Sequence, residues 1–451
     1  MASNGQRPSA RRAALHALLR VELGEGYSNL ALDGVLRRAA LSAEDKAFAT
    51  ALFYGVLERR ITLDYYLREC VRGRLSPYVR ECLRLGLYQI LYMDKVPDSA
   101  AVNETVELVK ASRENRAAGL CNAALRAASR KKEGWELPTG DSPEALSIRY
   151  ACPPWLAQNL KGDYGEAAAR GFLEDSLRTP PVYIRVNTLK TTCPALAQDL
   201  EETGIAVRPA GLEDALGLTA PGGVESNPLY IRGLFHVQDL ASQYCVALLD
   251  PQPGERILDL CAAPGGKSFT VAQRMEDRGQ LVACDLHEGR VGLIRDGAKR
   301  LGLTCLRAGQ NDGRVYDPAL SGVWEEALPF DRVLCDAPCS GFGIIRRKPD
   351  IKYKDPDGLK ALPGLQLSIL ENGSRYVRPG GRLVYSTCTL RRAENQKVCG
   401  RFLASHPEFS LEKGRADIRS ACADDPDGMY TFMPQVHGSD GFFAAVFRRA
   451  D

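Results

Sequence analysis

The sequence contains no long apolar stretch. None of its uninterrupted hydrophobic runs approaches the roughly 20 residues that a membrane-spanning helix needs. The amino-terminal residues carry arginines followed by an amphipathic pattern, and they contain no signal-peptide core. Internal repeats and low-complexity segments are also missing. We therefore expect a cytoplasmic globular protein with no membrane partner.

Cysteine is plentiful, but the spacing that marks zinc sites is absent. The 14 cysteines are scattered from Cys70 to Cys422, and no two of them form a Cys-x-x-Cys pair. Cysteines distributed in this way are mostly reduced residues of a protein core. The sequence thus predicts neither a metal site nor a disulfide framework.

The charge is distributed unevenly along the 451 residues, a length that predicts two or three domains. Residues 1–135 contain 22 Lys and Arg against 15 Asp and Glu, whereas the whole chain carries a net charge of only +3. A basic segment of this size favours contact with phosphates, although arginine-rich helix faces are often simply solvated. Charge alone leaves both interpretations open.

Hydrophobic spacing divides the chain into three predicted domains. Residues 1–138 show a 3.6-residue apolar period without a strand pattern, which predicts an all-α domain. Residues 145–234 mix short helices with strands, in a small α+β, RRM-like linking domain. There Val182–Val186 is the first strand, and we expect Ile205–Val207 to pair next to it. Residues 235–451 alternate strands with helices, as in a doubly wound, Rossmann-like α/β domain.

The stretch Arg256–Ser268, RILDLCAAPGGKS, is a candidate ligand site. Its apolar run Ile257–Leu260 predicts a buried parallel strand, and Pro264, Gly265 and Gly266 predict a sharp turn into a helix. The glycines let the backbone approach a ligand closely, and the first helical turn offers unpaired N–H groups. Nucleoside triphosphates, dinucleotides and S-adenosylmethionine are three ligand classes that bind at such turns.

Two of these three ligand classes fit poorly. A P-loop ending in Gly266-Lys267-Ser268 needs a glycine where this sequence has Cys261. A dinucleotide fingerprint needs two glycines at positions that here hold bulkier residues. S-Adenosylmethionine remains, and Asp285, which ends the next apolar run, suits the ribose hydroxyls of any adenosine-containing ligand.

Two later predicted strands are followed by reactive side chains. Phe330–Gly343 contains a strand that ends at Asp336 and is followed by Cys339, and Gly380–Leu390 contains a strand followed by Cys388. A single cysteine at a strand end is usually a buried structural residue. Ligands of open α/β sheets, however, bind at the carboxyl ends of the strands. We therefore expect both thiols, together with Asp285 and Asp336, to converge beside the cofactor.

These motifs resemble the signatures of the RsmB/Sun family of RNA cytosine-5 methyltransferases. The matching stretches are Asp-Leu-Cys-Ala-Ala-Pro-Gly-Gly-Lys (259–267), Asp-Ala-Pro-Cys-Ser-Gly (336–341), Ser-Thr-Cys-Thr (386–389) and Arg-Arg-Lys-Pro-Asp-Ile (346–351). One departure is Ser268, where many relatives have Thr, and it preserves the hydroxyl. The resemblance also implies that residues 1–138 form a NusB-like RNA-binding domain and that the substrate is small-subunit (16S) ribosomal RNA.

The resemblance implies a covalent mechanism with assigned residues. Cys388 would attack C6 of the cytosine, Cys339 would assist release, and Asp336 would bond the cytosine edge near the methyl donor. A thiolate is required because C5 is too poor a nucleophile until an adduct at C6 moves electron density towards it. Asp285 would hold the ribose of S-adenosylmethionine and Asp312 its adenine end. The methionine and ribose side would lie against Cys261, Ala262, Ala263, Pro264, Gly265, Gly266 and Lys267.

Other functions are open on the sequence alone. An amino-group methyltransferase would carry Asp/Asn-Pro-Pro-aromatic where Asp336-Ala337-Pro338-Cys339 stands, which argues against that class. A non-enzymatic NusB-like RNA-binding factor is an alternative from another class, and the intact cysteine motifs argue against it. A tRNA or another RNA could replace ribosomal RNA as the substrate. We expect the enzyme to act as a monomer without a metal.

Overall fold

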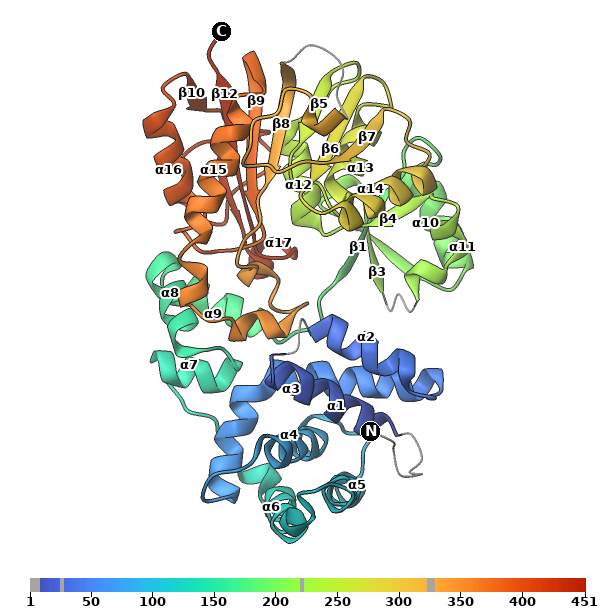
Figure 1. The fold of residues 1–451 in the computed structure, drawn as a ribbon, viewed down its shortest axis with the longest axis vertical. Coiled ribbons are helices and arrows are strands. Elements are labelled where there is room, and N and C mark those ends of the chain that lie inside the picture. Colours follow the sequence, from blue (N-terminus) through green and yellow to red (C-terminus); the bar gives the residue numbers. More distant parts are fainter. Residues whose placement is uncertain (1–8, 25–27, 220–222, 323–328) are drawn as a thin grey trace. The chain divides into compact units, whose positions relative to one another are not determined.

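The structure, a computed structural model, describes residues 9–24, 28–219, 223–322 and 329–451 (Figure 1). The chain forms two compact units, Met1–Arg178 with Ile345–Lys354, and Thr179–Ile344 with Asp355–Asp451. Within the described ranges, none of the helices is both long and apolar enough to cross a membrane.

The described residues of the first unit form helices. They are α1 (Ala10–Glu22), α2 (Ser28–Arg38), α3 (Ala43–Cys70), α4 (Pro77–Tyr92), α5 (Asp98–Lys110), α6 (Ala118–Lys131), α7 (Pro143–Tyr150), α8 (Pro154–Tyr164) and α9 (Glu166–Asp175). Side-chain caps begin several of them: the Ser42 and Ser76 hydroxyls accept hydrogen bonds from the backbone N–H groups of Asp45 and Val79. Apolar faces of α1 and α3 to α6 form the core, with Leu52 and Leu83 fully buried. The predicted all-α domain is confirmed.

The segment Ile345–Lys354, which contains the Arg-Arg-Lys-Pro-Asp-Ile motif, belongs to this helical unit. Lys352 is fully buried, and its Nζ donates to the Glu58 carbonyl at 3.0 Å. Arg346 forms an ion pair with Asp175 at 2.8 Å. Burial lowers the pKa of Lys352 to about 8. The segment that contains the motif therefore contributes buried polar contacts within the helical unit.

The second unit begins with a four-stranded antiparallel sheet in the order β2-β3-β1-β4. Its strands are β1 (Val182–Val186), β2 (Ala206–Ala210), β3 (Leu212–Thr219) and β4 (Phe235–Val237), with α10 (Cys193–Glu202) and α11 (Pro228–Ile231) between them in the chain. The α+β class is confirmed. The expected pairing of Ile205–Val207 with the first strand is wrong, because β3 lies between β1 and β2.

A larger sheet in the order β10-β12-β9-β8-β5-β6-β7, with β11 on β12, dominates the second unit (Figure 1). Its strands are β5 (Arg256–Asp259), β6 (Gln280–Asp285), β7 (Leu306–Gln310), β8 (Phe330–Asp336), β9 (Val377–Thr387), β10 (Phe409–Leu411), β11 (Met429–Phe432) and β12 (Phe442–Arg449). The helices of this part are α12 (Leu240–Leu249), α13 (Gly266–Arg274), α14 (Glu288–Leu301), α15 (Leu362–Ser374), α16 (Gln396–Ser405) and α17 (Pro434–His437). The predicted Rossmann-like α/β class is confirmed.

The order of these strands decides where a ligand can bind. Strands β5 to β9 run parallel, and β12 pairs with β9 in the antiparallel direction. From β5 the chain first builds β6 and β7 on one side, and it then returns to add β8 and β9 on the other. The carboxyl end of β5 is therefore the topological switch point, where open α/β sheets bind ligands.

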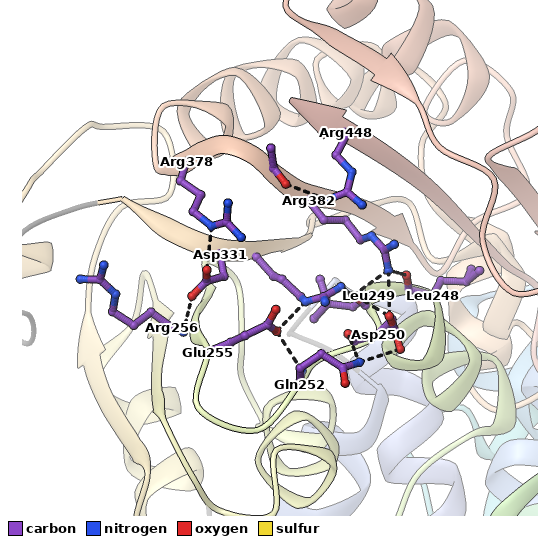
Figure 2. A network of polar contacts seen from close by, with 12 residues as sticks. Leu248, Leu249, Asp250, Gln252, Glu255, Arg256, Asp331, Arg378, Arg382 and Arg448 are labelled. Carbon is purple, nitrogen blue, oxygen red and sulfur yellow. Dashed lines mark hydrogen bonds and ion pairs between the residues drawn. The ribbon is translucent and has the colours of Figure 1, made fainter. Parts of the chain in front are cut away.

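The opposite, amino-terminal end of these strands is held by arginines and acids (Figure 2). Asp331 accepts hydrogen bonds from the Arg256 backbone at 2.8 Å and from Arg378 Nε at 2.7 Å, so it joins β5, β8 and β9. Arg382 donates to the carbonyl of Leu249 at 3.2 Å, at the end of α12. These contacts fix the three central strands relative to each other, while their carboxyl ends carry the loops of the candidate site.

Acid should destabilise the second unit through His236 on β4. His236 is buried, and burial together with Arg185 and Arg300 lowers its pKa to about 3. The unfolded chain therefore binds a proton at this residue as the pH falls below 6.5, whereas the folded protein binds it only near pH 3. Between these two values the free energy of unfolding decreases by about 1.4 kcal/mol per pH unit. In urea unfolding, the His236→Asn variant should show a smaller difference in the free energy of unfolding between pH 6.5 and pH 4.5 than the wild type does. The exposed-histidine control His287→Asn should keep the wild-type slope, and an equally steep loss in both variants would contradict this account.

Candidate active site

The turn between β5 and α13 has the geometry of a ligand cradle. Gly265 adopts φ +112°, and a Cβ there would lie 2.3 Å from the ring of Phe269, so glycine is required. The Ala262 N–H donates to the carbonyl of Cys284 at 2.8 Å, which holds the turn against β6. Helix α13 starts at Gly266, so its first N–H groups have no partner within the helix. The turn thus presents donors and the positive end of a helix dipole.

Beneath this turn lies the buried acid Asp259. The Ser268 hydroxyl donates to Asp259 Oδ2 at 2.6 Å, which gives a role to the hydroxyl that Ser268 preserves. Burial, the largest cause, raises the pKa of Asp259 to about 7. Asp259 Oδ1 is buried and has no hydrogen-bond partner in the described part of the chain. An acceptor left in this state fits a ligand that brings its own donor, as the amino and ribose groups of S-adenosylmethionine do.

Asp285, the predicted ribose acid, ends β6 and is already engaged. Its carboxylate accepts from the His287 N–H at 3.2 Å and pairs with Arg290 Nη1 at 3.1 Å. Arg290 also donates through Nη2 to the carbonyl of Ala263 at 2.6 Å. One arginine of α14 therefore bridges the acid and the turn. Arg290 was not among the predicted site residues, although a basic residue in the first turns of the helix after the acid was a usable signal.

Asp312, the predicted adenine-side acid, lies in the loop that follows β7. Arg314 Nη2 pairs with its Oδ2 at 2.5 Å, and the Arg314 backbone N–H donates to Oδ1 at 3.0 Å. The hydrogen bond from Arg314 is the main cause that lowers the pKa of Asp312, so the group is ionised at neutral pH. Asp312 thus follows β7, the strand beside the one that ends at Asp285, and a neighbouring arginine holds its carboxylate.

Asp336 ends β8 and forms the charged centre of the site. Lys267 Nζ donates to Asp336 Oδ2 at 2.6 Å, and the Ser386 hydroxyl donates to Oδ1 at 2.7 Å. Burial alone would lower the pKa of Lys267, but the attraction of Asp336 outweighs it and raises that pKa. Lys267 also lies 5.0 Å from the centre of the Phe442 ring. The lysine of the turn therefore stays charged and joins the loop after β5 to the loop after β8.

The two predicted thiols come together as expected. Cys339 Sγ and Cys388 Sγ lie 3.1 Å apart, in the loops that follow β8 and β9, and both residues are half-buried. The hydrogen bond with Cys388, burial and the nearby carboxylates raise the pKa of the Cys339 thiol. Cys339 therefore keeps its proton at neutral pH, and either sulfur can be the donor in the contact between the two thiols.

A third group of acidic and thiol side chains lies near β11. Ligand atoms of Cys422, Asp424 and Asp425 lie within 4.8 Å of one another. Asp424 pairs with Arg392 at 2.7 Å, and Asp425 accepts from the Thr431 hydroxyl at 2.7 Å. Both carboxylates are therefore already used in contacts that hold the β11 region.

Comparison with known proteins matches all three parts of the chain. The family described as 16S rRNA methyltransferase RsmB/F matches residues 246–448, and the NusB family matches residues 8–130. The ferredoxin-like domain of RsmF/B-like methyltransferases matches residues 152–225. The predicted order of a NusB-like domain, a small α+β domain and a methyltransferase domain is confirmed, whereas the limits that we placed at 138, 145 and 234 stay predictions.

Similar proteins cover nearly the whole chain. The probable ribosomal RNA small subunit methyltransferase B of Bacillus subtilis (strain 168) is 38% identical, and the alignment covers 98% of this chain and 99% of that protein. The crystal structure of PH0851 is similar with a TM-score of 0.80 at 27% identity, over 99% of this chain and 100% of the other. A methyltransferase homolog from Pyrococcus horikoshii has a TM-score of 0.59 at 28% identity, over 69% and 100%. These matches, together with the turn and the paired thiols, show that the chain belongs to the RsmB/F family of S-adenosylmethionine-dependent methyltransferases.

Proposed function

We propose that this protein transfers a methyl group from S-adenosylmethionine to C5 of a cytosine in small-subunit (16S) ribosomal RNA through a cysteine-linked intermediate. The observation that carries the proposal is the pair of thiols, 3.1 Å apart and at the carboxyl ends of neighbouring strands. The name of the Bacillus subtilis relative supports ribosomal RNA as the substrate.

The two thiols have complementary roles in this reaction. The Cys388 thiolate adds to C6 of the cytosine, and the electron pair displaced from the C5–C6 bond makes C5 nucleophilic. Bound S-adenosylmethionine supplies the electrophilic methyl group. The proton at C5 is then removed, the C5–C6 double bond forms again, and the C6–sulfur bond breaks. Cys339, whose proton is retained because its pKa is raised, lies in position to hydrogen-bond the departing sulfur of Cys388.

Asp336 and Lys267 orient the base and keep charge where it is needed. The Asp336 carboxylate accepts hydrogen bonds, so it can receive the exocyclic amino group of cytosine, which carries N–H donors. Lys267 and Ser386 each hold one Asp336 oxygen, at 2.6 Å and 2.7 Å, and this fixes the plane of the carboxylate. The ion pair thereby joins base recognition to the cofactor turn, from which Lys267 comes.

The residues that we assign to the cofactor surround the turn. The methionine and ribose side lies against Cys261 to Lys267, Asp285 takes the ribose hydroxyls, and Asp312 takes the adenine end. Asp285 now pairs with Arg290. A ribose bound by Asp285 therefore has to share this carboxylate with Arg290 or displace it.

A basic pocket in the helical unit supports a phosphate contact with the RNA. It has a volume of about 600 Å³ and lies where α3 ends and α4 begins, lined by Arg68, Arg74 and Arg80 among others. Arg68 and Arg74 are exposed, and neither forms an ion pair with a described residue. The one acid of the lining, Asp64, is neutralised by Arg84 at 2.6 Å.

Two of the basic side chains at the end of α6 are engaged in ion pairs, whereas Arg126 and Arg130 form none with a described residue. Lys131 is paired with Glu69, and Lys132 with Asp98 at 3.5 Å. The pocket also adds the amino end of the 16-residue helix α4, which begins after Ser76 and favours anions. We therefore assign RNA phosphate binding to the α3–α4 pocket, which combines arginines unpaired among the described residues with the amino end of a helix.

Replacing the two thiols separates attack from release. Cys388→Ala removes the attacking atom, so neither methylation nor an RNA–protein adduct should form. Cys339→Ala leaves attack and methyl transfer possible but slows elimination, so a covalent complex with methylated RNA should accumulate. Denaturing gel electrophoresis after incubation with 16S rRNA and cofactor detects the adduct, and bisulfite sequencing of the RNA locates the methylated cytosine.

The same experiment defines what contradicts the proposal. An adduct in the Cys388 variant but not in the Cys339 variant would invert the two roles. Activity retained in both variants without any adduct would eliminate covalent catalysis. Methylation of tRNA but not of 16S rRNA by the wild-type protein would assign another substrate.

Asp285→Ala should weaken binding of S-adenosylmethionine by about 1–3 kcal/mol, because hydrogen bonds to a charged acceptor are lost. Isothermal titration calorimetry measures the affinity. Glu288→Ala is the matched control, since Glu288 is an exposed acid nearby that pairs with Arg295 at 2.5 Å. Equal affinity in wild type and in the Asp285 variant would remove Asp285 from the site.

Arg68→Ala combined with Arg74→Ala should weaken rRNA binding by a salt-dependent amount. Each lost phosphate contact reduces the slope of log affinity against log salt by about 0.7–0.9, because fewer counterions are released. Fluorescence anisotropy at several salt concentrations measures both quantities. Lys110→Ala, which removes an exposed lysine already paired with Glu107 at 2.7 Å, should keep the wild-type slope. If the double variant also kept it, the pocket would not contact RNA.

A further inference from the structure

Two adjacent residues, Glu394 and Asn395, contact the loops that carry the thiols, and the reaction steps given above assign neither of them a role. Both side chains are fully buried, just before α16. Burying a carboxylate costs free energy unless the charge is paired and hydrogen-bonded. Glu394 meets this condition, because Arg391 Nη1 donates to its Oε1 at 2.9 Å. The burial of these two polar side chains therefore needs a specific structural or functional reason.

Glu394 holds the backbone around Cys339. The Ser340 N–H donates to Glu394 Oε2 at 2.9 Å. Gln366, from α15, donates through Nε2 both to the carbonyl of Pro338 at 3.0 Å and to the same Glu394 oxygen at 2.9 Å. The residues before and after Cys339 are therefore fixed by one Gln366–Glu394 unit.

Asn395 holds the backbone around the second thiol through the oxygen and the nitrogen of its side-chain amide. Its Oδ1 accepts from the Thr387 hydroxyl at 2.6 Å, and its Nδ2 donates to the carbonyl of Thr389 at 2.8 Å. These are the residues immediately before and after Cys388. One buried amide thus holds the loop on both sides of Cys388.

The two thiol loops are also joined directly. The hydroxyls of Ser340 and Thr389 are 2.8 Å apart, and the Gly343 N–H donates to the carbonyl of Cys388 at 3.0 Å. These contacts keep the loops adjacent. The 3.1 Å separation of the sulfurs therefore depends on backbone positions that Glu394 and Asn395 set.

We propose that Glu394 and Asn395 are positioning residues, one for each step of the reaction. Asn395 sets the attack by Cys388, and Glu394 with Gln366 sets the assistance of release by Cys339. This inference rests on the thiol roles given under the proposed function. Neither residue touches substrate or reacting atoms in this scheme; each acts through the backbone of the neighbouring loop.

Single-turnover experiments with full-length protein, 16S rRNA and S-adenosylmethionine test the assignment. Asn395→Ala should slow the appearance of the covalent adduct by about tenfold to a hundredfold, since small displacements of reacting groups have effects of this size. Glu394→Ala should form the adduct at nearly the wild-type rate but slow its decay by at least tenfold. Quenched samples on denaturing gels give both rates.

Two further variants separate positioning from general loss of stability. Glu394→Gln keeps an oxygen that can accept hydrogen bonds from Ser340 and Gln366. The covalent adduct of this variant should therefore decay faster than the adduct of Glu394→Ala. Asn187→Ala removes a comparable buried amide, whose Nδ2 donates to the carbonyls of Gly233 and Leu301 at 2.8 Å and 2.9 Å. It should leave the ratio of adduct formation to decay unchanged.

The rates of adduct formation and decay also define the results that would overturn the proposal. If Asn395→Ala and Glu394→Ala changed formation and decay in the same ratio as Asn187→Ala does, both residues would be merely structural. Cys388→Ala and Cys339→Ala are measured alongside. If these two failed to separate attack from release, the thiol roles would be wrong and the positioning proposal would fall with them. If they separated the steps and the other variants did not, only the positioning proposal would fail.

Discussion

The site depends on the register of three parallel strands. Pairing aligns Asp259 of β5 with Leu334 of β8, and Asp336 of β8 with Ser386 of β9. The loops after these strands therefore start at one edge of the sheet, and the Ser386 hydroxyl reaches Asp336 at 2.7 Å. A slip of one residue would turn one of these side chains to the opposite face and break this contact. The polar contacts at the amino ends of the strands (Figure 2) oppose such a slip.

Three of the acids at this edge are each matched by a cation close in the fold, whereas the buried Asp259 has the Ser268 hydroxyl as its partner. Asp285 pairs with Arg290, Asp312 with Arg314, and Asp336 with Lys267. Carboxylates gathered at one sheet edge would otherwise repel each other in a medium of low polarity. The cations offset this repulsion and leave the carboxylate oxygens available as acceptors. A ligand with several donors can then take over or share these acceptors.

Sequence patterns predicted what depends on local order. The turn at 260–266, the strand ends at Asp285 and Asp336, and the meeting of Cys339 with Cys388 follow from periodicity and parallel topology. Contacts between distant segments were beyond this reasoning. The expected pairing beside Val182–Val186 was wrong because the acids and glycine of Leu212–Thr219 hide a strand. Arg290, Gln366 and Asn395 were missed because each joins a backbone carbonyl to one polar side chain, and such single contacts leave no period in a sequence.

The separation of the sulfurs limits how the thiols can share charge. Two thiolates 3.1 Å apart would repel each other strongly in a half-buried site, so at most one of them ionises near neutral pH. The raised pKa of the Cys339 thiol means that Cys339 stays protonated near neutral pH. In the proposed mechanism, a protonated Cys339 can donate to the sulfur of Cys388 before attack and again when the C6–sulfur bond breaks. In the proposed mechanism the close pairing serves both attack and release, and the contacts that hold the backbone on each side of the two thiols maintain it.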